Sequence, residues 1–340
     1  MYRIGLVGAG GVGQKRAAAV AAHPESELAL VCDLNPEASA ALARQHGAAT
    51  VATWEELVAA EGLDVVVVST THDWLAPISA AALRAGKHVL AEKPLGRNPG
   101  EARLAVAAAA RSGRCLKAGY NHRYHPAILK LRQVCDAGLL GPLHFVRGRY
   151  GHGGRPGYER EWRADPARSG GGELLDQGAH LVDLSRWFLG DFARVSGEIS
   201  TQYWDITPLE DNAFGLFATA TGQVASLHVS WTQWKNLFSF EVFGRDGYAT
   251  ATGLGRSYGP EQAVVGRRAP AGGAPAEECF AFSGEDQSWN LEWEDFIGAV
   301  KTGRPPLAEG REALQTLEWI YRLYRAAREG RSISAGEEPT

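Results

Sequence analysis

The chain has 340 residues, a formal net charge of −4 and four cysteines. This length is enough for two domains with cores of ordinary size, and the acidic balance argues against nucleic acid as the main partner. The longest aliphatic run, residues 65–68, is too short for a membrane span. The cysteines lack the CxxC spacing that would indicate a disulfide framework or a zinc site, and no signal peptide is recognisable. We therefore expect a cytoplasmic protein with free thiols.

The first part of the chain alternates short apolar runs with alanine-rich stretches. We predict strands over 3–7, 28–32, 65–69 and 88–91. Helices are predicted over 12–22, 36–46, 54–60 and 77–85. This order predicts an α/β domain over residues 1–118, a doubly wound parallel sheet with helices on both faces. Ligands of such sheets bind at the carboxyl ends of the strands, where Gly8, Asp33, Ser69 and Glu92 fall.

From residue 119 the pattern changes, and we predict a second α/β domain over 119–340 with a large open, mainly antiparallel sheet. Its predicted strands cover 144–150, 193–204, 211–220, 223–232 and 237–243. Its predicted helices cover 126–137, 174–189, 289–301 and 311–328. Residues 259–278 are dense in Gly, Pro and Ala, which indicates a surface excursion.

A glycine-rich turn directly follows the first predicted strand. It reads Gly8-Ala9-Gly10-Gly11-Val12-Gly13. In a dinucleotide-binding turn the three glycines reverse the chain, admit the pyrophosphate to the backbone and let the helix pack on the strand. The free amides at the start of that helix then face the anion.

Asp33 ends the second predicted strand, about 20 residues beyond the glycines. A carboxylate there accepts hydrogen bonds from the adenosine ribose of NAD and repels the 2′-phosphate of NADP. Leu34 follows it, where a site for NADP more often offers Arg or Ser, so the sequence favours NAD over NADP. The alternative is that Asp33 is an ordinary turn residue before Asn35 and Pro36.

Two further motifs carry groups suited to proton transfer. Glu92-Lys93-Pro94 ends a predicted strand, and the proline aims Lys93, whose ammonium can stabilise a developing alkoxide. Asp176 and His180 lie four residues apart on one face of a predicted helix, where the carboxylate can orient the imidazole as a general base. The alternatives are a solvated lysine and a structural or metal-binding Asp/His pair. We expect no metal, because no third ligand accompanies the pair.

These motifs, in this order, resemble one family of oxidoreductases. Those not yet quoted are Gly119-Tyr120-Asn121-His122-Arg123-Tyr124, Trp162-Arg163, and Ser169-Gly170-Gly171-Gly172. The chain is similar over nearly its whole length to the glucose-fructose oxidoreductase, inositol dehydrogenase and rhizopine-catabolism family, Gfo/Idh/MocA. The resemblance implies a Rossmann domain, an α/β domain whose sheet forms a homodimer or homotetramer, and NAD(P)-dependent hydride transfer on sugars or cyclitols.

The resemblance also implies roles for individual residues. Lys93 matches the lysine of the family's Glu-Lys-Pro motif, Asp176 its aspartate and His180 its proton-transferring histidine. The cofactor-binding set we predict is Gly8, Ala9, Gly10, Gly11, Val12, Gly13, Asp33, Leu34, Ser69, Thr70, Thr71, His72, Trp74, Glu92, Lys93 and Asn121. The substrate-binding set is Lys93, Arg123, Tyr150, Trp162, Arg163, Asp176 and His180.

One stretch departs from the family pattern. The family commonly has Thr-Pro-Asn followed three residues later by His, whereas this chain reads Thr70-Thr71-His72 and then Leu75. A polar contact to the cofactor is therefore lost there, or supplied by His72 or Trp74.

The segment around the second motif is rich in arginine and aromatic residues. Its arginines are Arg147, Arg149, Arg155, Arg160, Arg163 and Arg168. They suit a carboxylate or phosphate, as in acidic or nucleotide sugars, or else they form surface ion pairs. Trp231 and Trp234 flank a strand end, where they line the pocket or pack in the core or against another subunit.

The hypothesis from the sequence is an NAD-dependent enzyme that moves hydride between nicotinamide and a secondary hydroxyl, or the corresponding ketone, of a sugar, cyclitol or nucleotide sugar. His180 removes the hydroxyl proton and Lys93 holds the oxyanion. Two alternatives stay open. One is a glycosidase or lyase that acts through transient oxidation, and the other is a noncatalytic NAD-bound regulator. No membrane or nucleic-acid partner is expected.

Overall fold

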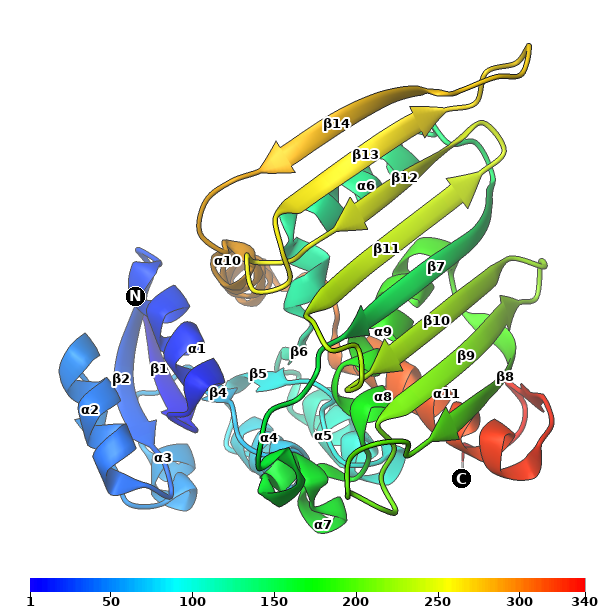
Figure 1. Ribbon diagram of the computed structural model, residues 1–340. Coiled ribbons are helices and arrows are strands. Elements are labelled where there is room, and N and C mark those ends of the chain that lie inside the picture. The colour runs from blue at the N-terminus through cyan, green and yellow to red at the C-terminus, as the bar shows by residue number, and fades with distance from the viewer. Residues whose placement is uncertain (340) are drawn as a thin grey trace. The chain divides into compact units, whose positions relative to one another are not determined.

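The computed structural model describes residues 1–339, which form two compact units, shown as ribbons in Figure 1. Unit 1 contains residues 1–120, 167–170 and 289–315, and unit 2 contains 121–166, 171–288 and the chain from Thr316 onward. The sequence predicted that everything after residue 118 belongs to the second domain. The structure instead includes two later segments in unit 1.

Unit 1 is built on a six-stranded parallel sheet, as predicted. Its strands are β1 (Tyr2–Val7), β2 (Ser26–Cys32), β3 (Ala49–Thr50), β4 (Val65–Val68), β5 (His88–Glu92) and β6 (Leu116–Gly119). They lie in the order β3-β2-β1-β4-β5-β6. The order reverses between β1 and β4, and in such sheets ligands bind beside this point at the carboxyl ends of the strands.

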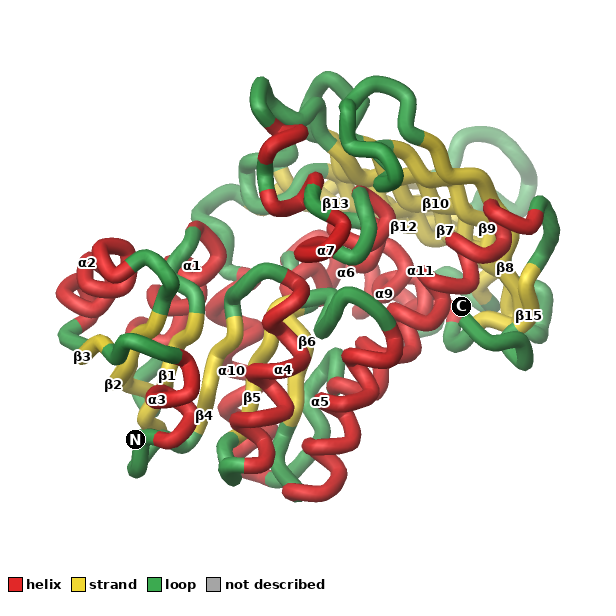
Figure 2. Tube along the Cα trace, turned by 90° about the horizontal axis from the view of Figure 1, so that it is seen from below, coloured by secondary structure: helices red, strands yellow, loops and turns green. Residues whose placement is uncertain are grey.

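Helices cover both faces of this sheet (Figure 2). They are α1 (Gly11–Ala22), α2 (Pro36–His46), α3 (Trp54–Ala59), α4 (His72–Arg84), α5 (Pro99–Ser112) and α10 (Ser288–Thr302). Residue alternation in β1 sets the two faces: Ile4 and Leu6 join the core beneath α1, while a Cβ on Gly5 would meet Leu57 of α3 at 2.6 Å. Helix α4 begins five residues before the predicted start at Pro77, because its second turn accommodates the proline.

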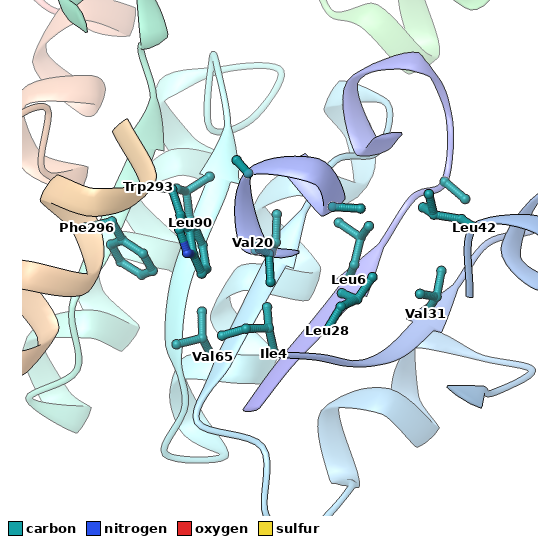
Figure 3. Packing of buried hydrophobic residues seen from close by; sticks show 14 of the residues in the cluster. Ile4, Leu6, Val20, Leu28, Val31, Leu42, Val65, Leu90, Trp293 and Phe296 are labelled. Atoms are coloured by element: carbon teal, nitrogen blue, oxygen red, sulfur yellow. The ribbon is translucent and has the colours of Figure 1, made fainter. Parts of the chain in front are cut away.

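The late segment joins unit 1 through its core. Trp293, Phe296 and Ile297 of α10 pack against Ile4, Leu90 and other residues of the early strands (Figure 3). Trp293 is 1% exposed, and its indole N–H donates to Ser26 Oγ at 3.1 Å. Helix α10 therefore completes a face of the sheet that the first 120 residues leave uncovered.

Unit 2 contains a nine-stranded sheet, antiparallel except where β7 and β10 run parallel. Its strands are β7 (Leu143–Gly151), β8 (Phe192–Ser200), β9 (Asn212–Thr219), β10 (Val224–Ser230), β11 (Leu237–Gly244), β12 (Gly247–Thr252), β13 (Glu261–Arg267), β14 (Ala276–Phe282) and β15 (Ile333–Ser334). Their order is β14-β13-β12-β11-β7-β10-β9-β8-β15. The predicted excursion over 259–278 is wrong, because β13 and the start of β14 lie within it.

Helices pack on one face of this sheet. Unit 2 contains α6 (Pro126–Asp136), α8 (Glu173–Asp176), α9 (Gly178–Leu189) and, from Thr316 onward, α11 (Gly310–Glu329). The short helix α7 (Pro166–Ser169) belongs to unit 1 except for its first residue. Leu181 of α9 lies over Gly148 of β7, and Leu323 of α11 over Gly197 of β8. The predicted helix 174–189 is two helices, separated at Gln177.

The opposite face of the sheet is open and carries exposed apolar side chains, Phe145, Phe214 and Leu216 among them. Phe145 stacks on Phe243 of β11, with ring centroids 4.6 Å apart. Within residues 1–339, no helix is both long enough and apolar enough to cross a bilayer.

Candidate functional site

The glycine turn of unit 1 has the geometry that a dinucleotide requires. Gly8 has φ +99°, and a Cβ on it would lie 2.4 Å from the Ser69 carbonyl oxygen. A Cβ on Gly13 would lie 1.9 Å from the Gly8 carbonyl oxygen, so only glycine lets α1 approach the turn this closely. By contrast, a Cβ on Gly10 or Gly11 would meet nothing within 4 Å. The backbone at α1's N-terminus is therefore open to an anion.

The Asp33 carboxylate is fixed at the end of β2 beside this turn. Its Oδ2 accepts the Ala9 N–H at 2.6 Å and its Oδ1 accepts the Asn35 N–H at 2.8 Å. Each oxygen keeps a lone pair for a ribose hydroxyl. Leu34 is 93% exposed beside it. These residues fit the adenosine end of a dinucleotide.

The stretch that departs from the family pattern lies at the start of α4. Thr71 Oγ1 donates to Asp73 Oδ1, and Trp74 is 42% exposed beside the ring of Trp54. His72 is 3% exposed, and its Nδ1 donates to the Ser169 carbonyl oxygen at 2.8 Å. The His72 ring thus holds segment 167–170 within unit 1. Contact of the cofactor with Ser69, Thr70, Thr71, His72 or Trp74 stays a prediction.

A buried ion network includes Glu92, which is the last residue of β5 and the first residue of the Glu92-Lys93-Pro94 motif. Arg16 Nε donates to Glu92 Oε1 at 2.7 Å, and Arg16 Nη1 to Glu292 Oε2 at 2.5 Å. Lys117 Nζ lies 3.6 Å from Glu292 Oε1. Burial raises the pKa of Glu92, and the Arg16 guanidinium opposes that rise. The residue that precedes Lys93 is therefore anchored in the core of unit 1.

In unit 2, His180 lies in the first turn of α9 and is 5% exposed. Its ring stacks on His122, with centroids 3.6 Å apart and planes at 20°. Tyr150 of β7 contacts both imidazoles, at 5.1 Å from His122 and 6.3 Å from His180. Burial raises the pKa of Tyr150 well above its usual value, so its hydroxyl stays protonated. The His180 ring is therefore held by a stack on His122 and an edge contact with Tyr150.

Asp176 is the last residue of α8 and is 6% exposed. Arg163 Nε donates to Asp176 Oδ2 at 2.8 Å, and the Asp176 charge raises the pKa of Arg163. The same guanidinium lies 4.5 Å from the ring centre of Trp162. The helix is interrupted at Gln177, between α8 and α9. Asp176 and His180 therefore do not share the one face of a regular helix that the sequence predicted. Orientation of His180 by Asp176 stays a prediction.

Two predicted site residues have internal partners. Arg123 is 1% exposed and forms a bidentate pair with Asp183, at 2.8 and 2.7 Å. The Asn121 amide donates to Ser288 Oγ at 3.0 Å. Arg123 thus forms a buried ion pair with Asp183 in unit 2. We therefore leave Arg123 out of the proposed substrate contacts.

Most arginines of the arginine-rich segment have acidic partners nearby. Arg155 pairs with Glu161 at 2.6 Å, and Arg147 pairs with Glu241 across strands at 2.6 Å. Arg160 lies 3.8 Å from Glu159. With the Arg163–Asp176 pair, four of the six arginines are neutralised. The ion-pair interpretation of this segment is therefore favoured over recognition of an acidic substrate.

Sequence reasoning missed several neighbours of these groups. Arg16 and Glu292 lie in helices that gave no polar signal, 276 positions apart. Tyr258 accepts the Gln177 amide N–H at 3.0 Å and packs on Tyr150, and it directly precedes the segment that was predicted as a surface excursion. His122 is part of the motif quoted from the sequence, but no role could be assigned to it there.

The turn, the carboxylate at the end of β2 and the strand order define unit 1 as a dinucleotide-binding Rossmann unit. Residues 2–120 match the model "Oxidoreductase family, NAD-binding Rossmann fold", and residues 128–250 match the "GFO/IDH/MocA C-terminal domain". The chain belongs to the Gfo/Idh/MocA family, which confirms the resemblance found in the sequence.

Individual relatives agree with this assignment. A 1,5-anhydro-D-fructose reductase of Ensifer adhaerens is 31% identical over 73% of this chain and 74% of its own length. A levoglucosan dehydrogenase of Pseudarthrobacter phenanthrenivorans is 27% identical, over 64% of this chain and 59% of its own length. The solved structure titled "Levoglucosan dehydrogenase, complex with NADH and L-sorbose" has a TM-score of 0.90 over all of both chains at 20% identity, which shows the shared fold.

Proposed function

We propose that this protein is an NAD-dependent dehydrogenase that acts on a secondary hydroxyl of a neutral sugar or cyclitol. The observation that carries the proposal is a buried imidazole, His180, which stacks on His122 four positions after the Asp176–Arg163 pair, in a chain whose first unit carries the dinucleotide turn. The neutralised arginines favour uncharged substrates over nucleotide sugars. The relatives' names, which refer to anhydro sugars, support the same class.

In the proposed reaction, His180 accepts the proton of the substrate hydroxyl. Its Nδ1 is enclosed by protein, so we assign this proton to Nε2. Lys93 donates a hydrogen bond to the same oxygen and stabilises its developing negative charge. Arg163 fixes the Asp176 carboxylate, whose charge favours the imidazolium that forms. When bound, the nicotinamide supplies the acceptor for the hydride that leaves the carbinol carbon. The reverse transfer reduces the ketone.

An absorbance assay at the NADH band tests this proposal. Purified protein is incubated with NAD⁺ and a panel of neutral sugars, inositols and nucleotide sugars. We expect NADH to accumulate with a neutral sugar or inositol. Conversion of a glycoside without net NADH would replace the proposal with transient oxidation. NADH binding without any conversion would replace it with a regulatory role.

Replacing Asp33 with alanine is expected to weaken NADH binding by about 10- to 100-fold, because a charged acceptor is worth roughly 1.5–3 kcal/mol. NADPH binding should weaken less, because the repulsion of its 2′-phosphate is removed. Fluorescence titration with both cofactors measures the change. Glu37→Ala is the matched control, because it removes an exposed carboxylate four residues away that is outside the predicted cofactor-binding set, and it should keep the wild-type preference. A wild-type protein that binds both cofactors equally would contradict the assignment of NAD.

We also propose that the open face of the unit 2 sheet forms a homodimer or homotetramer. Exposed Phe145, Phe214 and Leu216 lie on this face, and contiguous apolar patches of this kind mark interfaces. Light scattering should give a mass of two or four chains, and Leu216→Arg should reduce it. A monomeric wild-type protein would contradict this proposal.

A further inference from the structure

Three loops of unit 2 leave the sheet along one edge. Ser200 pairs with Asn212, Asn212 with Ser230, and Ser230 with Gly151, so these four residues form one row across β8, β9, β10 and β7. The loops that start or end at this row cover residues 152–165, 201–211 and 231–236. The first of them carries Arg163, the partner of Asp176.

Two large aromatic side chains of these loops lie in solvent. Tyr203 is 64% exposed and Trp234 is 62% exposed, although Trp231, three residues earlier, is fully buried. The rings of Tyr203 and Trp234 are 4.8 Å apart at 83°, and Trp204 continues the row at 5.3 Å from Tyr203. We call Tyr203 and Trp234 the aromatic shelf.

The loop that carries Tyr203 is held by hydrogen bonds to a buried carboxylate, Asp211. Asp211 accepts the backbone N–H groups of residues 202, 203 and 204 at 2.9, 2.8 and 3.0 Å. Burial acts to raise the pKa of Asp211, but these donors hold it below its usual value, so the carboxylate stays charged. The Trp204 indole donates to the Trp231 carbonyl oxygen at 3.1 Å. Tyr203 is therefore exposed on an ordered loop.

Trp234 is presented at a conformational cost. Its φ of +58° lies in the left-handed region, which is unusual for a bulky residue. A Cβ on Gly153 would lie 3.1 Å from Trp234 Cα, so glycine allows the two loops to approach. Strained residues of this kind persist where the surrounding structure fixes them, and they concentrate at ligand sites.

The shelf is tied to the Asp176 segment by consecutive residues. Glu210 accepts the N–H groups of Gly172 and Leu174 at 3.1 and 3.0 Å, at the start of α8. Its neighbour Asp211 holds the shelf loop. The distance between the shelf and Asp176 is thus set by one short buried stretch within unit 2.

We propose that the aromatic shelf binds a second sugar ring, so that the substrate is a glycoside or disaccharide whose non-reacting pyranose lies against Tyr203 and Trp234. A pyranose offers a face of C–H groups to aromatic rings and hydroxyl groups at its rim. Exposed polar residues, Gln202 and Lys235, flank the two rings. This inference rests on the proposed function, which makes Asp176 and His180 the groups at the reacting ring.

A second copy of the chain is a poorer occupant of the shelf. Two aromatic side chains bury about 150–250 Å² each, far below the roughly 800 Å² per partner of a stable interface. The exposed apolar residues Phe145, Phe214 and Leu216 lie on strands of the open face rather than on these loops.

The test compares a monosaccharide with disaccharides built from it. Binding of glucose, cellobiose and maltose to the NADH complex is measured by saturation-transfer NMR and tryptophan fluorescence, in wild type and in Trp234→Ala and Tyr203→Ala. We expect a wild-type preference of about tenfold for at least one disaccharide, as one to two aromatic contacts provide. Each alanine variant should lose most of it while glucose binding stays unchanged. The matched variants Trp234→Phe and Tyr203→Phe keep a ring and should retain it.

Several outcomes would overturn the inference. Absence of any disaccharide preference in the wild type would do so, as would equal weakening of glucose and disaccharide in the alanine variants. A change in oligomeric mass with sugar binding intact would assign the shelf to a subunit contact. Failure of the proposed function is distinguishable, because the binding experiment needs no turnover: a shelf-dependent preference without oxidation of any sugar removes the proposed chemistry and keeps the shelf.

Discussion

Replacing His180 with alanine is expected to lower kcat by about 10²- to 10⁴-fold, which is the usual contribution of a positioned general base. NADH affinity should change little, because the dinucleotide turn lies in unit 1 and His180 lies in unit 2. Steady-state kinetics on the substrate found by the absorbance assay, with NADH titration alongside, measure both quantities. His144→Ala is the matched control, since His144 is an exposed histidine of the same unit.

Lys93→Ala should cause a loss of similar order for a different reason, because it removes the cation that stabilises the alkoxide. If the two residues act on one hydroxyl, the double variant should be little slower than the slower single variant, since groups that act as a unit are not additive. Near-wild-type turnover in either single variant would contradict the role proposed for the residue that it replaces. Fully multiplicative losses would show that the two residues serve separate steps.

Replacing Arg16 with methionine should destabilise the protein by about 3–5 kcal/mol, the cost of leaving buried carboxylates without their cation. Arg16 is 1% exposed and Glu292 is fully buried, so Glu92 and Glu292 would face each other with less compensation. Urea unfolding followed by circular dichroism measures the loss. Lys15→Met is the matched control, because Lys15 is exposed and only lies over the ring of Trp289, at 5.1 Å.

A double variant tests whether the loss comes from the unpaired carboxylates. Arg16→Met/Glu292→Gln removes one charge of each sign and should recover part of the stability lost in Arg16→Met. If Arg16→Met costs no more than Lys15→Met, the ion network contributes little and Glu92 tolerates its surroundings as a neutral acid.

The parallel sheet of unit 1 could be predicted because its strands are short apolar runs between alanine-rich helices. Strand β14 was missed for a physical reason. Residues 276–279 of β14 are exposed on a sheet edge, so neither face imposes an apolar alternation. The break at Gln177 was also missed, because the apolar spacing of 174–189 continues across it.

For the candidate site, the sequence predicts roles for residues whose chemistry is carried by short motifs, such as Gly8, Asp33, Lys93 and His180. It could not assign partners that only folding brings together. Arg123 looked like a substrate contact in its motif, yet it forms a bidentate pair with Asp183. Likewise, the His122 stack on His180 depends on a close approach of segments 58 positions apart, which no periodicity encodes.

The contribution of α10 to unit 1 also has a consequence during protein synthesis. Residues 1–120 leave the ribosome about 170 residues before Trp293 and Phe296, which complete their core. At roughly 5–20 residues per second, that interval lasts about 10–30 seconds. For this time the nascent chain leaves uncovered the part of the apolar face around Ile4 and Leu90 that α10 later covers.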